Sequence, residues 1–176
     1  MDCIYVIIKW LTFPGALIRA FLEQLSCKLY NVPVEYPKYM QNNSLCGHVD
    51  HELISGKGSF GICFIPHIIT LIAGLVILIP GAVQIFYLNN YDWISFVLVY
   101  FGISLLSNVF VLPEDAASMW DSLYGKDSKA SKASKILLAP GAAVIYAGSR
   151  LDVYSITFVI AIVMAYFMGD FIALFI

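Results

Sequence analysis

The first polar segment of the chain contains side chains that could bind a metal ion. Cys46, His48 and His51 follow the spacing C-x-H-x-x-H, and Glu52 comes next. Thiolate sulfur and neutral imidazole nitrogen are good ligands for zinc. The spacing differs from that of a zinc finger, and a solvated loop with two histidines would contain the same residues. The sequence therefore leaves a metal site and an ordinary loop both open.

A second group of residues with charged or reactive side chains lies on one face of an expected helix. Arg19, Glu23 and Cys27 are spaced at i, i+4 and i+8, and the residues around them are largely apolar. Charged side chains on a membrane helix face protein or a water-filled cavity rather than lipid. We expect an internal ion pair, a polar edge among lipid headgroups, or a functional site. Cys63 and His67 form a further i, i+4 pair at the start of the next helix.

The composition shows which solvent must surround these residues. Hydrophobic residues make up 60% of the chain and charged residues 12%, whereas soluble domains carry about 25% charged residues. The mean hydropathy is +0.82. A soluble fold could not cover so much apolar surface, so we expect a lipid bilayer to replace water over much of it. The net charge of −2 argues against a nucleic-acid partner, which requires a basic face.

Three segments are apolar over the length that a membrane-spanning helix needs, which is about 20 residues. Two of them contain no charged residue, and the third contains only Asp170. A short polar turn at 89–92 joins the first two, so they are predicted to form a transmembrane hairpin at 62–112. The three segments are 62–88, 93–112 and 153–176.

Two other apolar segments are interrupted by proline. The first 30 residues break at Pro14, which fits two half-helices, a re-entrant pair or one kinked span. A short helix is expected near 136–149, around Pro140. The sequence thus predicts an all-α fold, a polytopic transmembrane helical bundle that forms a single integral membrane domain over residues 1–176.

The lysines indicate how the bundle is oriented. They occur in both polar segments, 31–61 and 113–135, and are absent from the turn at 89–92. Lysine and arginine accumulate in cytoplasmic loops. We therefore predict that both polar segments are cytoplasmic, that the turn lies outside, and that the protein is a multi-pass protein of the cell membrane.

Three runs of sequence, in the same order, resemble a known family. The run 13–35 reads F-P-G, then a helix, then V-P-V; the run 46–74 contains CGHVDHE; and the run 102–123 contains PEDAASMW. Together they resemble small membrane-embedded zinc metalloproteases of the site-2-protease-like group. The resemblance implies that the helix after F-P-G should bear the motif HExxH, and that Asp115 should be the third zinc ligand.

The chain departs from that family at the residues that matter most. The two histidines of HExxH fall on Arg19 and Glu23, and its glutamate falls on Ala20. Arginine stays protonated and cannot bind zinc, and alanine cannot act as a general base. The usual mechanism, in which the glutamate deprotonates a zinc-bound water, therefore cannot operate on this helix.

Three hypotheses about function follow. The first is a non-catalytic, metalloprotease-like protein that binds a membrane protein partner or oligomerises as an accessory subunit, without a cofactor. The second is an intramembrane metallohydrolase with zinc in a rearranged site built from Glu23, His48, His51 and Asp115, with Cys27 or Cys46 as further ligands. The third is a small transporter or channel component that uses the charges of Arg19, Glu23 and Asp170.

Overall fold

The regular elements of the chain are all helices. The computed structural model describes residues 3–34, 49, 57–126, 128 and 130–173, and the prediction of an all-α fold is confirmed over these residues. The helices are α1 (Cys3–Leu11), α2 (Phe13–Leu29), α3 (Lys57–Ala82) with its π-helical continuation η1 (Val83–Tyr87), α4 (Trp93–Leu106), α5 (Pro113–Tyr124), α6 (Lys132–Asp152) and α7 (Ile156–Ala173).

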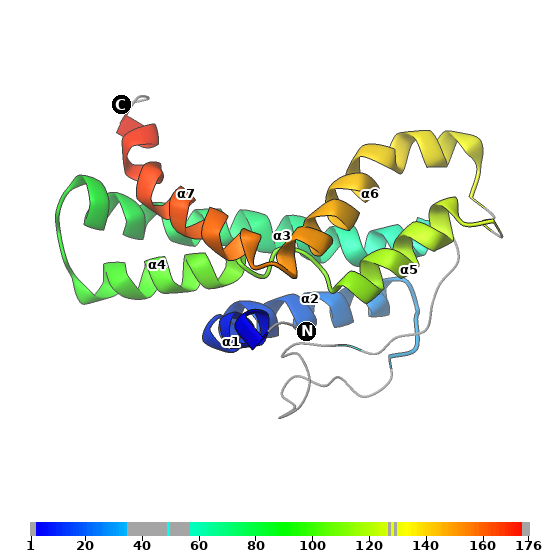
Figure 1. Ribbon diagram of the computed structural model, residues 1–176, viewed down its shortest axis with the longest axis horizontal. Coiled ribbons are helices and arrows are strands. Elements are labelled where there is room, and N and C mark those ends of the chain that lie inside the picture. Colours follow the sequence, from blue (N-terminus) through cyan, green and yellow to red (C-terminus); the bar gives the residue numbers. More distant parts are fainter. Residues whose placement is uncertain (1–2, 35–48, 50–56, 127, 129, 174–176) are drawn as a thin grey trace.

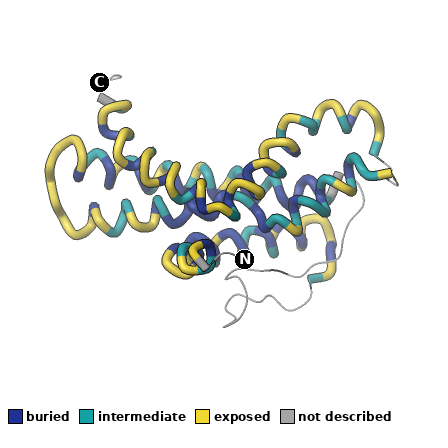
Figure 2. Tube along the Cα trace, viewed as in Figure 1, coloured by how far each residue is buried: buried dark blue, intermediate teal, exposed yellow. Residues whose placement is uncertain are grey.

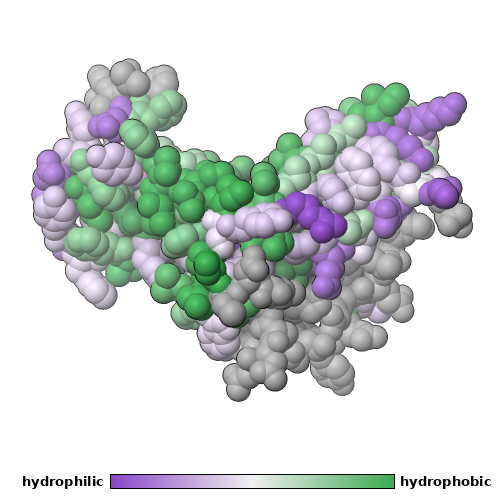
Figure 3. All heavy atoms as spheres, in the orientation of Figure 1, coloured by the Kyte–Doolittle hydropathy of each residue, from purple (hydrophilic) through white to green (hydrophobic). Residues whose placement is uncertain are grey.

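The longest of the described helices is strongly apolar. Ser59–Tyr87 forms 29 residues that are long and apolar enough to cross a membrane. Pro66 and Pro80 lie inside it, and membrane helices tolerate proline because neighbouring groups satisfy the backbone atoms that it frees. Figure 3 shows that the middle of the molecule is mostly hydrophobic and that hydrophilic residues gather toward its two ends.

The helices α3 and α4 run antiparallel, side by side, as one hairpin (Figure 1). Their backbones approach closely at Gly102, where a Cβ atom would lie only 2.7 Å from Cα of Leu78. Small residues allow such close packing between membrane helices. The helix α4 ends at Leu106, earlier than the predicted span 93–112, and the chain turns at Ser107 and Asn108.

Two pairs of helices are sharply bent. The axes of α1 and α2 differ by 82°, and those of α6 and α7 differ by 98°. The described residues therefore contain one clear membrane-crossing helix, or up to three if each bent pair is one span. The sequence left a kinked span and two half-helices open for the first pair; the structure has two helices with the break at Thr12. The helix predicted near 136–149 is longer at both ends and continues through Pro140.

The segment 113–135 is not a loop throughout, as the sequence predicted, since α5 and the first turn of α6 lie within it. Met119 and Leu123 of α5 are fully buried against Ala142 and Ile145 of α6, and both helices are dark blue where they face each other and α3 (Figure 2). This apolar contact explains why so polar a sequence folds into the protein. Its predicted cytoplasmic location remains a prediction.

Replacing Gly15 by alanine should destabilise the fold by about 1–3 kcal/mol, the usual cost of overpacking. A Cβ atom there would collide with the backbone carbonyl oxygen of Ser104, and backbone cannot swing aside. Gly141→Ala is the matched control: it also lies inside a helix, but its Cβ would meet only the ring edge of Phe60, at 3.0 Å. Equal unfolding midpoints for the two variants in detergent would contradict the close contact of α2 with α4.

Candidate functional site

Three breaks in the helical chain meet at one buried place. They are Thr12 between α1 and α2, the segment 107–112 between α4 and α5, and the segment 153–155 between α6 and α7. Each break frees backbone carbonyl groups that a continuous helix would satisfy. Where such groups are buried away from water, protein groups must supply the hydrogen bonds. The polar side chains of this region lie where that need arises.

A buried lysine joins two of the three breaks, the one between α4 and α5 and the one between α6 and α7. Lys9 of α1 is 4% exposed, and its ammonium forms an ion pair of 2.7 Å with Oδ2 of Asp152 at the end of α6. Its other donors reach the carbonyl oxygen of Ser107 at 2.9 Å and Oδ1 of Asn108 at 3.1 Å. An ammonium group has three donors, and here each has an acceptor. All three N–H donors of the ammonium group are therefore satisfied by protein groups.

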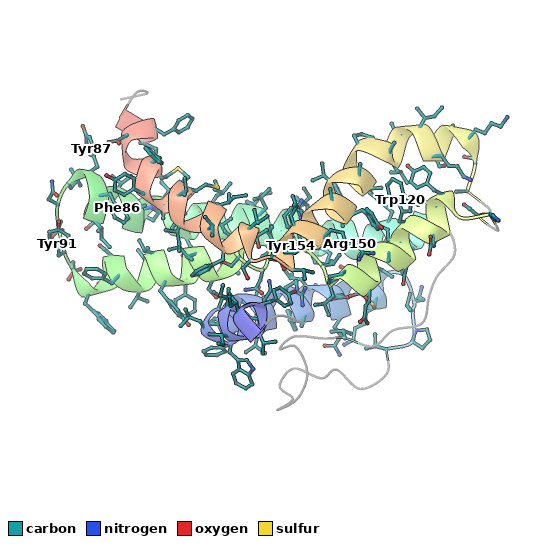
Figure 4. All side chains as sticks on the ribbon, viewed as in Figure 1. Phe86, Tyr87, Tyr91, Trp120, Arg150 and Tyr154 are labelled. Atoms are coloured by element: carbon teal, nitrogen blue, oxygen red, sulfur yellow. The ribbon has the colours of Figure 1, made fainter. Side chains whose placement is uncertain are left out.

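The carboxylate of Asp152 also accepts hydrogen bonds from two hydroxyl groups. Tyr5 donates its hydroxyl to Oδ2 at 3.4 Å, and the hydroxyl of Thr157 on α7 donates to Oδ1. Asp152 therefore ties the two helices on either side of the α6–α7 bend to each other and to α1. We refer to Tyr5, Lys9, Asn108, Asp152 and Thr157 as the Lys9 cluster. Figure 4 shows Arg150 and Tyr154 beside this bend, on the outer side of the helices.

Asn108 connects the Lys9 cluster to the first break. Its amide nitrogen donates to the carbonyl oxygen of Thr12 at 3.0 Å and to the carbonyl oxygen of Ser104 at 2.8 Å. The hydroxyl of Ser104 also donates to the Thr12 carbonyl, at 2.9 Å, and accepts from the backbone N–H of Gly15 at 2.8 Å. These bonds satisfy the backbone on both sides of the α1–α2 bend. They explain how a turn of 82° is held inside an apolar protein.

The predicted polar face of α2 is buried and points at the second break. Arg19 is 2% exposed and donates from its guanidinium to the carbonyl oxygen of Phe110 at 3.0 Å. Glu23 is also buried, one turn further along α2. The thiols of Cys27 and Cys63 lie within electrostatic range of the carboxylates of Glu23 and Asp115. Of the readings that the sequence left open, the structure thus favours an internal face over a headgroup edge.

The two members of the i, i+4 pair on α3 have different partners: Cys63 reaches the first turn of α5, and His67 reaches the segment between α4 and α5. The thiol of Cys63 contacts the carbonyl oxygen of Asp115 at 3.9 Å. His67 lies 3.2 Å from the carbonyl oxygen of Val109 through Nδ1, and its ring stacks on Phe110 with centroids 5.0 Å apart. Helix α3 therefore holds the same segment that Arg19 holds from α2.

The structure brings together only part of the predicted metal site. Glu23 and Asp115 lie in the same region, whereas His48, His51 and Cys46 lie outside the described residues. Among the residues that the structure does describe, no three histidine, cysteine or acidic side chains are placed to hold a metal ion. The four-residue zinc set therefore stays a prediction. Asp170, the charged residue of the third predicted span, is exposed near the end of α7.

Sequence reasoning missed the centre of the polar network. Asp152 lies just before the predicted span 153–176. Asn108 lies inside the predicted span 93–112, and because it is uncharged it does not stand out from the apolar residues there. One signal was available: Lys9 is the lone charge of its apolar run, and a buried cation needs a buried anion. The acidic residue next to a helix break was the place to look for it.

Comparisons with protein-family models, with curated proteins and with solved structures gave no match. Interpretation of this site therefore depends on its own geometry.

Proposed function

We propose that the chain is a multi-pass membrane protein of metalloprotease-like architecture that acts without catalysis, as a binding or accessory subunit of a membrane assembly. Ser59–Tyr87 crosses the bilayer in this proposal, and α4 and the two bent pairs complete the bundle beside it. Tyr87 and Tyr91 lie together at the hairpin end of the molecule (Figure 4), where tyrosine suits a membrane interface. Two exposed lysines lie near the ends of other helices: Lys126 lies shortly after the end of α5, and Lys132 is the first residue of α6.

The observation that carries the proposal is the position of Arg19. In the metalloproteases that the sequence resembles, this position of the helix would bind zinc. Here its guanidinium is buried and donates to the carbonyl oxygen of Phe110. A permanently protonated side chain that completes a backbone hydrogen bond stabilises the scaffold and leaves no metal ligand. Lys9 and Asp152 also serve the scaffold, since their ion pair holds helix breaks together.

A binding role also suits the surface of the N-terminal helices. Large apolar side chains are exposed along the whole of α1 and α2, on the sides away from the polar centre. They offer a broad surface to lipid and to helices of a partner protein, since contacts within a membrane depend on close packing of such side chains. The exposed side chains are those of Ile4, Ile7, Trp10, Leu11, Phe13, Ile18, Phe21, Leu25 and Leu29.

One observation favours the second candidate, a metallohydrolase with a rearranged site. The carboxylates of Glu23 and Asp115 lie near the thiols of Cys27 and Cys63, and carboxylates and thiolates both bind zinc. This candidate requires further ligands from His48 and His51, which are outside the described residues.

The two candidates predict different results for protein taken gently from its native membrane. For the accessory subunit we expect recovery of a crosslinked membrane protein partner, and zinc far below about one ion per chain, the content of an occupied structural or catalytic site. A lone monomer without a crosslinked partner would contradict this function. Zinc at about one per chain that is lost in His48→Ala/His51→Ala and in Asp115→Asn, with Asp121→Asn as the exposed control, would establish the second candidate instead.

A further inference from the structure

An open groove of about 300 Å³ lies where α6 crosses the start of α3. Its walls are apolar and come from both helices, with the ring of Tyr30 at the end of α2 completing them. Tyr30 packs directly on α3 because Gly61 has no side chain, and a Cβ atom there would collide with the tyrosine hydroxyl. The apolar walls are Phe60, Phe64, Ile65, Leu137 and Leu138.

The position of the groove along α3 places it near the membrane surface. The helix Ser59–Tyr87 has 29 residues, so it is about 43 Å long at 1.5 Å per residue. The hydrocarbon core of a bilayer is about 30 Å thick, and about 40–45 Å with the headgroup regions included. The first turns of this helix, which line the groove, therefore lie at the depth where a lipid headgroup meets its acyl chains.

Two lysines lie close in the sequence to the part of α6 that lines the groove. Lys132 is exposed and Lys135 is half-buried, and they flank Ser134, which lines the groove. Leu137, on the next turn of α6, is 78% exposed. An apolar groove with lysines one and two residues from its lining matches the two parts of an anionic phospholipid, its acyl chain and its phosphate. A zwitterionic lipid offers the same chain without the net negative charge.

We propose that this groove binds an anionic phospholipid, with one acyl chain between α3 and α6 and the phosphate on Lys132 and Lys135. The inference depends on the proposed placement in the membrane and is independent of the proposed accessory role. The lipid would contact both α6 and α3 and stabilise their packing on the lysine-rich side of the bundle. A partner's transmembrane helix in the same groove is the competing occupant, and it would show no preference for the lipid headgroup.

Native mass spectrometry of the purified protein would test the proposal, with dioleoylphosphatidylglycerol and dioleoylphosphatidylcholine added in equal amounts to detergent micelles. We expect the anionic lipid to be retained preferentially. Lys132→Gln/Lys135→Gln should weaken its binding about thirtyfold, since each lysine near a lipid surface contributes about fivefold. Arg150→Gln removes an exposed cation from the other end of α6 and should leave the affinity unchanged.

The groove itself needs a separate test. Leu138→Trp should fill it and abolish retention of the lipid, whereas Leu151→Trp places the same bulk at an exposed site on α6 and should not. In the unmodified protein, a photoreactive group on the acyl chain should label peptides that contain Phe60–Ile65 or Leu137–Leu138. Equal retention of both lipids, an unchanged affinity in the lysine variant, or labelling confined to other helices would overturn the proposal. These measurements do not depend on zinc content or partner recovery, so the lipid proposal and the proposed function can fail independently.

Discussion

Replacing Lys9 by methionine will destabilise the folded protein by about 3–5 kcal/mol, because it leaves the carboxylate of Asp152 buried without its cation. The same change removes the hydrogen bonds to Ser107 and Asn108. Unfolding of the purified protein in mixed micelles, followed by far-ultraviolet circular dichroism, measures the loss. Lys132→Met, an exposed lysine at the start of α6, is the matched control and should change stability by less than about 0.5 kcal/mol.

A double variant separates the charge from the contacts. Lys9→Met with Asp152→Asn removes both charges, while the amide keeps partners in Tyr5 and Thr157. Because a buried charge without a partner is the main cost, the double variant should regain more than half of the stability lost by Lys9→Met. Strictly additive losses, or a loss below about 1 kcal/mol for Lys9→Met, would show that the two residues are not paired in the folded protein.

A zinc site should appear when two residues of α2 are changed. Arg19→His with Glu23→His places two imidazoles one turn apart on a buried face, close to the segment that carries Asp115. If the resemblance to the metalloproteases reflects their architecture, these two nitrogens and the carboxylate form a three-ligand zinc site. We expect about one zinc per chain by elemental analysis, against far less in the unchanged protein.

Two controls make this result specific. Adding Asp115→Asn to the double variant should remove most of the zinc, since one of three ligands is lost. Phe21→His with Leu25→His has the same spacing on an exposed part of α2, where no third ligand is at hand, and should bind little zinc. A folded double variant with no more zinc than this control would show that α2 and α5 do not have the arrangement of a metalloprotease site, and it would contradict the proposed metalloprotease-like architecture.

Much of the fold could be predicted from hydropathy alone. The segments that became α3, α4 and α7 contain almost no charge, so their helical state follows from the need to satisfy the backbone without water. An interruption near Pro14 was predicted, and Pro14 lies at the start of α2, just after the break at Thr12. The face formed by Arg19 and Glu23 could also be foreseen, since helical spacing places these residues together and lipid excludes them.

What could not be predicted from the sequence depends on contacts between distant segments. The segment 113–124 has an average polarity typical of a loop, yet it begins with Pro113, Glu114 and Asp115, a pattern that favours a helix start. Its apolar residues, such as Met119 and Leu123, become buried only because α6 lies against them. Likewise, the bend after α6 follows from the bonds of Asp152 to Lys9 and Thr157, and no local pattern contains that information.

The Lys9 cluster has a consequence for how the protein is made. Tyr5 and Asp152 are 147 residues apart in the chain, so a ribosome that adds about 5–20 residues per second needs roughly 7–30 s to make the second after the first. During that time Lys9 has been made and its anion has not. The contacts of the Lys9 cluster that involve Asp152 therefore cannot form until α6 has been made, so the final packing of α1 against the end of α6 is completed late in synthesis.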